Sequence, residues 1–279
     1  MKETDFLICP ICKSRLERID KSLICTGDSP KHHCFDLSSS GYSDLSYRSG
    51  GGGDPKDAVT DRTAFLDKGY YQPLSECINA ICRDYLNPDF FLVDAGCGEG
   101  YYSERIASEF TDAFVFGVDL SKHAAHRASV RRNIRNGNNS FYSVASVFQL
   151  PVDDSTADCV LSMFAPVAQS EAERVLKNDG IMIIGAAGDR HLYQLKESIY
   201  DTVHLNDERA DLPQGAELLD KRNVSYICHI DNAEDIRRLF GMTPYRFRTS
   251  ESSLKLLNEL TSIDVEINVD FYVYRISRN

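Results

Sequence analysis

One segment limits the fold of this chain more than any other: an apolar run that ends in an aspartate and leads into three glycines at alternate positions. The run is Phe90–Asp94, the glycines are Gly96, Gly98 and Gly100, and helical sequence begins near Tyr101. Glycine permits a tight turn between a strand and a helix, and it lets a ligand approach the backbone N–H groups closely. The segment therefore predicts a strand–turn–helix unit with a ligand site at the turn.

This unit is part of a longer alternation of strands and helices. The strand candidates after Pro88 are Phe90–Asp94, Phe114–Asp119, Phe141–Ala145, Cys159–Phe164 and Ile181–Gly185. Short apolar strands separated by helical sequence predict an α/β fold with a parallel sheet and crossover helices. We also expect helical sequence over 58–86, a long amphipathic helix over 191–204, a strand over 224–230, a helix near 233–240 and an antiparallel edge strand over 265–276.

The glycine turn and the neighbouring strand ends indicate the cofactor. The GxGxG spacing after Asp94 is common among class I (Rossmann-like) methyltransferases, whereas dinucleotide-dependent oxidoreductases use GxGxxG. Asp119 ends the next strand, where a carboxylate can accept both hydroxyls of a ribose. In methyltransferases of this class the adenine lies at the end of the third strand, here at Ser146, and the methyl group lies beside the fourth, here at Phe164. The expected cofactor is S-adenosylmethionine, and ordinary turn and cap chemistry is the weaker interpretation.

Four of the nine cysteines fall within the first 34 residues. Zinc prefers four tetrahedral ligands, and a metal would stabilise a segment too short to build its own core. A redox-active CxxC of the thioredoxin type would instead follow a strand in a βαβ unit, which this region lacks. The sequence therefore predicts a zinc-ribbon-like module with a closed structural site. Its candidate ligands are Cys9, Cys12 and Cys25, with His32, His33 or Cys34 as the fourth.

Composition divides the chain into a zinc-binding module (1–37), a Ser-, Gly- and Asp-rich linker (38–57) and a catalytic domain (58–279). No apolar run approaches the roughly 20 residues that a membrane helix needs. The polar start has no secretory apolar stretch behind it. We therefore expect a cytoplasmic protein without a membrane partner.

The net charge of −11 argues against a nucleic-acid binder that uses its whole surface. Any contact with RNA would need a local basic patch. Residues 122–135 carry five Lys/Arg, two His and no acid. This segment is either such a patch or a solvated helix face, and the sequence leaves both interpretations open.

Several short stretches of this sequence are informative as a set. They are Cys9-Pro10-Ile11-Cys12, Cys25, His33-Cys34-Phe35-Asp36, Gly41-Tyr42, Arg62, Ala64-Phe65-Leu66, Gly69 to Leu74, Gly96 to Tyr102, Phe116 to Asp119, Arg190-His191-Leu192 and Met242-Thr243-Pro244. Taken together, they make the chain resemble the bacterial 23S rRNA guanine-N1 methyltransferase family over nearly its whole length. In that family a Cys3His zinc module precedes the methyltransferase domain, and this implies His33 as the fourth ligand.

The resemblance also implies site residues and a substrate. It implies that Tyr71, Gly98, Glu99 and His191 contact the cofactor, although the residues alone indicate packing for Tyr71 and a core or capping role for His191. The implied substrate is a guanine in the helix 35 stem-loop of 23S rRNA. It further implies a homodimer whose zinc modules wall one RNA-binding cleft, and in some members an effect on susceptibility to tylosin-type macrolides.

Guanine N1 carries a proton at neutral pH, so the reaction needs a proton acceptor and an accessible base. Candidates are the Asp61 carboxylate and the backbone around Phe164–Ala165, with Phe164 stacking on the base. The Asn/Asp-Pro-Pro-aromatic tetrapeptide of exocyclic-amine methyltransferases is missing, which favours a ring nitrogen. The main alternative is a zinc-module methyltransferase that acts on a small molecule or protein, which the charge of −11 favours. A non-enzymatic RNA-binding or scaffold protein is a weaker alternative.

Overall fold

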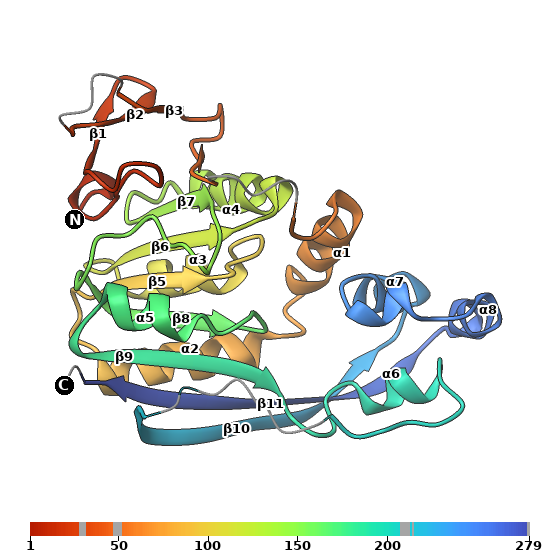
Figure 1. The fold of residues 1–279 in the computed structure, drawn as a ribbon. Coiled ribbons are helices and arrows are strands. Elements are labelled where there is room, and N and C mark those ends of the chain that lie inside the picture. Colours follow the sequence, from red (N-terminus) through yellow and green to blue (C-terminus); the bar gives the residue numbers. More distant parts are fainter. Residues whose placement is uncertain (28–31, 47–51, 207–212, 214, 278–279) are drawn as a thin grey trace.

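The computed structural model describes residues 1–27, 32–46, 52–206, 213 and 215–277 (Figure 1). An eight-stranded sheet runs in the order β10-β11-β9-β8-β5-β6-β7-β4. Its strands are β4 (Ser43–Asp44), β5 (Phe91–Ala95), β6 (Phe114–Asp119), β7 (Ser140–Val144), β8 (Ala157–Met163), β9 (Leu176–Ala187), β10 (Glu217–Ile230) and β11 (Ile263–Ile276). Strands β4 to β9 pair in parallel, whereas β11 pairs antiparallel with both β9 and β10. The predicted α/β, class I fold is confirmed.

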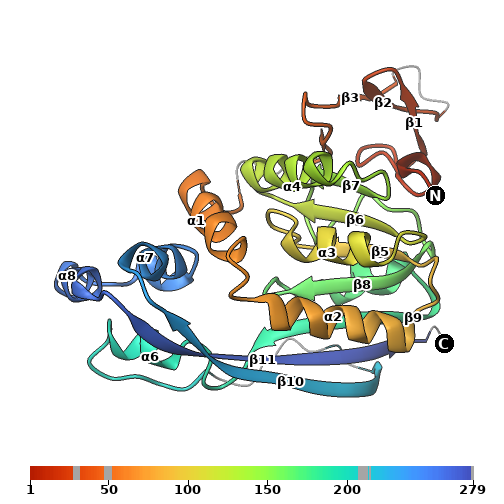
Figure 2. The ribbon, with the colours of Figure 1, turned by 180° about the vertical axis from the view of Figure 1, so that it is seen from behind.

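The helices cover both faces of this sheet. They are α1 (Lys56–Leu66), α2 (Gln72–Tyr85), α3 (Tyr101–Glu109), α4 (Lys122–Arg135), α5 (Gln169–Val175), α6 (Tyr193–Glu197), α7 (Ala233–Gly241) and α8 (Glu251–Glu259), with the 3-10 turns η1 (Glu3–Asp5) and η2 (Pro244–Phe247). In Figure 2, α2 and α3 lie in front of the sheet. Their apolar side chains, such as Leu74, Ile78 and Ile106, pack with sheet residues in one core cluster.

The opposite face has a different cover. Its core cluster joins sheet residues to Phe6, Leu7, Leu16 and Leu23 of the N-terminal segment. That segment forms a small three-stranded sheet from β1 (Leu16–Ile19), β2 (Ser22–Cys25) and β3 (Cys34–Asp36). The N-terminal module therefore shares a hydrophobic core with the catalytic sheet.

The segment expected to be a linker, 38–57, contributes a short strand to the eight-stranded sheet. Residues 43–44 form β4, which pairs in parallel with β7, while 47–51 lie outside the described residues. The division at 37 and 57 stays a prediction. In the part of the chain that the structure describes, no helix is both long and apolar enough to cross a membrane.

Residues 58–86 are helical as expected, in two helices, because Gly69 turns the chain with a φ of +83° between them. Two other local predictions were wrong in detail. The helix expected over 191–204 is only Tyr193–Glu197, since Lys196 Nζ donates to the backbone oxygen of His204 at 3.2 Å and the chain folds back. Strand β11 is antiparallel as expected, but it lies inside the sheet, and β10 is the edge.

Candidate active site

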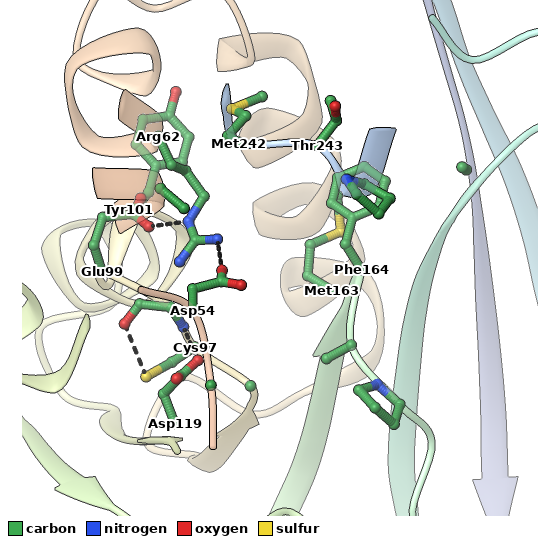
Figure 3. Close-up of a pocket in the computed structure, with 18 of the residues that line it drawn as sticks. Asp54, Arg62, Cys97, Glu99, Tyr101, Asp119, Met163, Phe164, Met242 and Thr243 are labelled. Carbon is green, nitrogen blue, oxygen red and sulfur yellow. Dashed lines mark hydrogen bonds and ion pairs between the residues drawn. The ribbon is translucent and has the colours of Figure 1, made fainter. Parts of the chain in front are cut away.

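The carboxyl ends of the parallel strands open into a cavity of about 1060 Å³ (Figure 3). Strand β5 pairs with β6 on one side and β8 on the other, and the crossovers diverge there, which is where open α/β sheets bind ligands. The cavity is at the upper end of the roughly 300–1,000 Å³ usual for small-molecule sites. It therefore has room for a nucleoside-type cofactor and a second reacting group.

Seven of the residues predicted for the site line this cavity, and three do not. Those that line it are Tyr71, Gly96, Gly98, Glu99, Asp119, Phe164 and His191. The residues Asp61, Asp94 and Ser146 are not among the lining residues, but each is within two positions of one that is: Arg62, Gly96 and Val147, respectively.

The turn between β5 and α3 requires glycine. Gly96 has a φ of +90° and Gly100 a φ of +78°, a region that side chains rarely adopt. A Cβ atom on Gly96 would lie 2.5 Å from the Cβ of Ala165, and one on Gly100 would lie 2.8 Å from the Cβ of Ala128. The turn therefore keeps the wall of the cavity free of side chains.

The two aspartates at the ends of β5 and β6 differ in exposure. Asp119 lines the cavity, and its carboxylate accepts hydrogen bonds from the N–H of Gly98 at 3.1 Å and of Ser121 at 2.7 Å. Asp94 is buried and accepts a hydrogen bond from Ser103 Oγ at 2.5 Å. Burial raises the pKa of Asp94 to about 7. Asp94 thus fixes the start of α3, and Asp119 is the carboxylate that a ligand can reach.

An ion-pair chain ties α1 to the glycine turn. The Nε atom of Arg62 donates to Glu99 Oε2 at 2.7 Å, and Arg62 also pairs with Asp54 (Figure 3). Arg131 of α4 donates from Nε to the backbone oxygen of Glu99 at 3.0 Å. Glu99 is buried, with its side chain 2% exposed. The sequence alone gives Arg62 no role, because its partner Glu99 is 37 positions away in the chain.

Three rings from three separate segments meet at the other end of the cavity. The ring centroid of Phe164 lies 5.5 Å from that of His191, and the Tyr71 centroid lies 6.5 Å from Phe164 and 6.3 Å from His191. Phe164 has a φ of +54° and remains 43% exposed. A bulky residue in this conformation is strained, and such strain clusters at functional sites.

His191 is a neutral hydrogen-bond donor. Its Nδ1 faces the backbone N–H of Asn268 at 3.3 Å and must accept that hydrogen bond, so Nε2 carries the ring proton. Burial, together with the positive charge of Lys196, lowers the pKa of His191 to about 4. At neutral pH the imidazole therefore adds no positive charge to the cavity.

Two other predicted residues support the wall. Ser146 Oγ accepts a hydrogen bond from the N–H of Phe148 at 3.2 Å, and it is Phe148 that lines the cavity. The carboxylate of Asp61 packs against Gly241, which also lines it. Burial raises the pKa of Asp61, although nearby Arg246 opposes that effect. Asp61 is therefore a carboxylate of increased basicity beside the cavity.

The N-terminal module gathers a candidate metal centre. The ligand atoms of Cys9, Cys12, Cys25 and His33 all lie within 4.8 Å of one another. His33 Nδ1 is 3.5 Å from Cys9 Sγ and 3.6 Å from Cys25 Sγ, close to the spacing of about 3.5 Å between neighbouring ligands of a tetrahedral zinc ion. Cys34 is exposed and points to Asp36. The donor set and its spacing fit zinc.

The basic segment forms α4, and much of its charge is used inside the protein. Arg131 pairs with Asp67, Arg135 with Glu104 at 2.6 Å, and Arg132 donates to the backbone oxygen of Ser40 at 3.3 Å. These contacts fix α4 to its neighbours. They leave less of the positive charge of 122–135 free to form the basic patch.

Known proteins match the methyltransferase domain alone or nearly the whole chain. The family profile described as "Methyltransferase domain" matches residues 92–180. The 23S rRNA (guanine(748)-N(1))-methyltransferase of Streptomyces fradiae is 33% identical over 282 residues, which cover 97% of this chain and 96% of that protein. The YxjB protein of Bacillus subtilis, which bears the name 23S rRNA (guanine-N(1)-)-methyltransferase provisionally, is 27% identical over 98% of this chain and 99% of its own.

Other relatives share only part of the chain. The malonyl-[acyl-carrier protein] O-methyltransferase of Geobacter sulfurreducens is 30% identical over 120 residues, 40% of this chain and 44% of that protein. A match over part of the chain therefore does not identify the methyl acceptor, whereas a match over nearly the full length includes the N-terminal module as well.

Proposed function

Because this chain belongs to the family of 23S rRNA (guanine-N1)-methyltransferases, we propose that it methylates N1 of a guanine in the helix 35 stem-loop of 23S rRNA. It is an S-adenosylmethionine-dependent methyltransferase of class I fold. The observation that carries the substrate proposal is the 33% identity over 97% of the chain, which includes the N-terminal module. The choice of helix 35 rests on the family resemblance.

The cavity suits S-adenosylmethionine. The glycine turn keeps side chains out of this part of the wall, and the Asp119 carboxylate can accept the ribose hydroxyls. When bound, the cofactor supplies an electrophilic methyl group. We assign positions beside the cofactor to Glu99, Tyr71 and His191, as the family resemblance implies. The neutral His191 suits that position, because a charged imidazole would repel a sulfonium ion.

The other part of the cavity suits a planar base. The exposed Phe164 ring can stack on a guanine that has left its helix, which costs little in a loop. Guanine N1 forms its new C–N bond as its proton leaves, and we assign that proton to the Asp61 carboxylate, whose raised pKa makes it a stronger base. The protein's main contribution is to hold the reacting atoms in line.

We propose that the metal site holds structural zinc. The four ligands Cys9, Cys12, Cys25 and His33 leave no open position for a substrate, as is usual for structural sites. Zinc would fold 1–37 into the module that covers one face of the catalytic sheet. Metal analysis of the purified protein tests this assignment, with one zinc ion per chain expected.

A small molecule or a protein is the alternative methyl acceptor. The net charge of −11 favours it, because that charge repels RNA phosphates. The test supplies labelled S-adenosylmethionine with three acceptors: 23S rRNA from cells that lack the modification, a ribosome-free protein fraction and a small-molecule extract. Label in the rRNA supports the proposal, and label only in another fraction overturns it.

Two further features follow from the same proposal. A homodimer would place two N-terminal modules beside one RNA, and light scattering of the purified protein measures its mass. Methylation of a helix 35 nucleotide would change susceptibility to tylosin-type macrolides, and inhibitory concentrations in strains with and without the gene measure that change.

A further inference from the structure

Exposed phenylalanine side chains gather around the cavity. Phe148 is 63% exposed, Phe164 is 43% exposed and Phe247 is 71% exposed, and all three line it. They come from three elements that are distant in sequence: the loop after β7, the end of β8 and η2. Large apolar groups that share one exposed site mark a binding surface. Phe164 already has a role in the site, whereas Phe247 does not.

Phe247 is exposed, but the turn that carries it is anchored to its neighbours by Arg246. The guanidinium carbon of Arg246 lies 5.1 Å from the centroid of the Phe247 ring. Arg246 also donates to the backbone oxygen of Gly241 at 3.1 Å and to Asp57 Oδ2 at 2.5 Å, which ties η2 to α7 and α1. The turn η2 is therefore fixed beside the cavity, and the Phe247 ring keeps much of its surface open to solvent.

The next residue supplies a positive charge that the fold does not use. Arg248 is exposed, and within the described ranges 1–27, 32–46, 52–206 and 215–277 its side chain makes no ion pair. Its neighbour Arg246, by contrast, is engaged with Asp57. The chain as a whole carries a net charge of −11, which repels RNA. An unpaired arginine beside an exposed aromatic ring is a local exception, because the two groups together can bind a nucleotide. The ring can stack on a base, and the guanidinium can bind a phosphate.

We propose that Phe247 and Arg248 form an RNA-binding rim, in which Phe247 stacks on an unpaired base next to the target guanine and Arg248 binds a phosphate of that strand. The proposal rests on the proposed function, because it takes RNA as the methyl acceptor. Phe247 lines the cavity and Arg248 follows it directly in the chain, and we expect both to act on the RNA and to leave cofactor binding unchanged.

The test is a set of initial-rate measurements on full-length variants with a hairpin RNA. Phe247→Ala and Phe247→Leu should raise KM for the RNA between about 5-fold and 100-fold, the usual range for one stacked base, while Phe247→Tyr retains it. Arg248→Ala should raise that KM and reduce the salt dependence by about one phosphate contact. In all four variants KM for S-adenosylmethionine and the melting temperature should stay at the wild-type values.

Two matched controls show whether the effect is specific to residues beside the cavity. Leu256→Ala removes an apolar side chain that is 59% exposed on α8, and Arg237→Ala removes an exposed arginine on α7; neither lines the cavity. Both controls should keep the wild-type KM for RNA. The proposal is overturned if Phe247→Ala leaves that KM unchanged, if Phe247→Leu behaves like Phe247→Tyr, or if a control loses as much. A wild-type enzyme that does not methylate the RNA overturns the proposed function itself.

Discussion

The ring of Phe6 lies 4.3 Å from the ring of Phe91, centroid to centroid. Phe6 belongs to the N-terminal module and Phe91 begins the central strand β5, so this module and the catalytic sheet share one core. Cys9 and Cys25, two of the candidate metal ligands, belong to the same cluster of buried residues. The module is thus part of the structure that supports the active site.

This shared core predicts the effect of metal removal. Cys25→Ser should abolish zinc binding and lower the melting temperature of the whole chain in a single transition. A metal present at 1,000 times its dissociation constant contributes about 4 kcal/mol, and this would be lost. Calorimetry with and without a chelator measures the effect. Cys34→Ser, at an exposed cysteine outside the cluster, should change neither zinc content nor stability. A separate early transition for the module would contradict the prediction.

A second prediction concerns Asp235, a buried carboxylate on α7. It accepts hydrogen bonds from Lys68 Nζ at 2.6 Å and from Tyr70 OH at 2.9 Å. These two donors lie in the loop that leads into Tyr71, so Asp235 holds this loop in place. Burial opposes its ionisation, but these and other donors lower the pKa of Asp235 to about 2. Asp235→Asn should cost about 1–3 kcal/mol, because the buried group loses its hydrogen bonds to charged donors.

Urea denaturation measures that cost. Because Tyr71 lines the cavity, the Asp235→Asn variant should also raise KM for S-adenosylmethionine. Glu234→Gln is the control: its side chain is 64% exposed and its partner Arg238 lies on the same helix, so the change should stay below about 1 kcal/mol. Equal stabilities of the two variants would show that Asp235 does not fix the position of the loop.

A third prediction is a pH dependence of stability from His191. Its pKa is lowered to about 4 in the folded chain, below the ordinary 6.5, so the unfolded chain binds more protons between these values. Stability is therefore fully present above pH 6.5 and falls as the pH drops toward 4, by about 3 kcal/mol. Melting temperatures from pH 7 to 4.5 should fall less steeply for His191→Gln. Asn268→Ala should keep the wild-type slope, because the donor to His191 is a backbone N–H; identical slopes for His191→Gln and the wild type would refute the assignment.

A fourth prediction separates backbone strain from steric contact at the glycine turn. Gly96→Ala combines a φ of +90° with a Cβ only 2.5 Å from the Cβ of Ala165, so it should weaken S-adenosylmethionine binding at least 10-fold and lower stability by about 1–3 kcal/mol. Gly215→Ala has a similar φ of +78° with nothing within 4 Å of the new atom. The Gly215→Ala variant should therefore lose stability from backbone strain alone, and its binding of S-adenosylmethionine in titration calorimetry should be normal. Normal binding by Gly96→Ala would exclude the turn from the cofactor site.

Local signals made much of the fold predictable. The run from Phe90 to Gly100 specified a strand, a turn and a helix within a few residues, and the structure has β5 and α3 there. The pair Cys9 and Cys12 similarly indicated a metal site within one short segment. Such patterns involve residues that are close together in the chain, so they can be recognised from the sequence without the structure.

Long-range contacts could not be predicted in the same way. Tyr71, Phe164 and His191 come from three segments, and only the family resemblance pointed to two of them. Arg62 meets Glu99 across 37 positions, and Asp235 meets Lys68 across 167. The predicted helix over 191–204 failed for a related reason, since its amphipathic pattern comes from packing against β11 and from the fold-back at His204.

Mapping the methylated nucleotide tests the central claim most directly. Purified protein, S-adenosylmethionine and 23S rRNA that lacks its modifications are incubated, and the product is copied by reverse transcriptase, which N1-methylguanine blocks. The account predicts a new stop at one guanine of the helix 35 loop, present only with both enzyme and cofactor. Cofactor binding without any new stop in the rRNA would contradict the account and would point to a small molecule or a protein as the methyl acceptor.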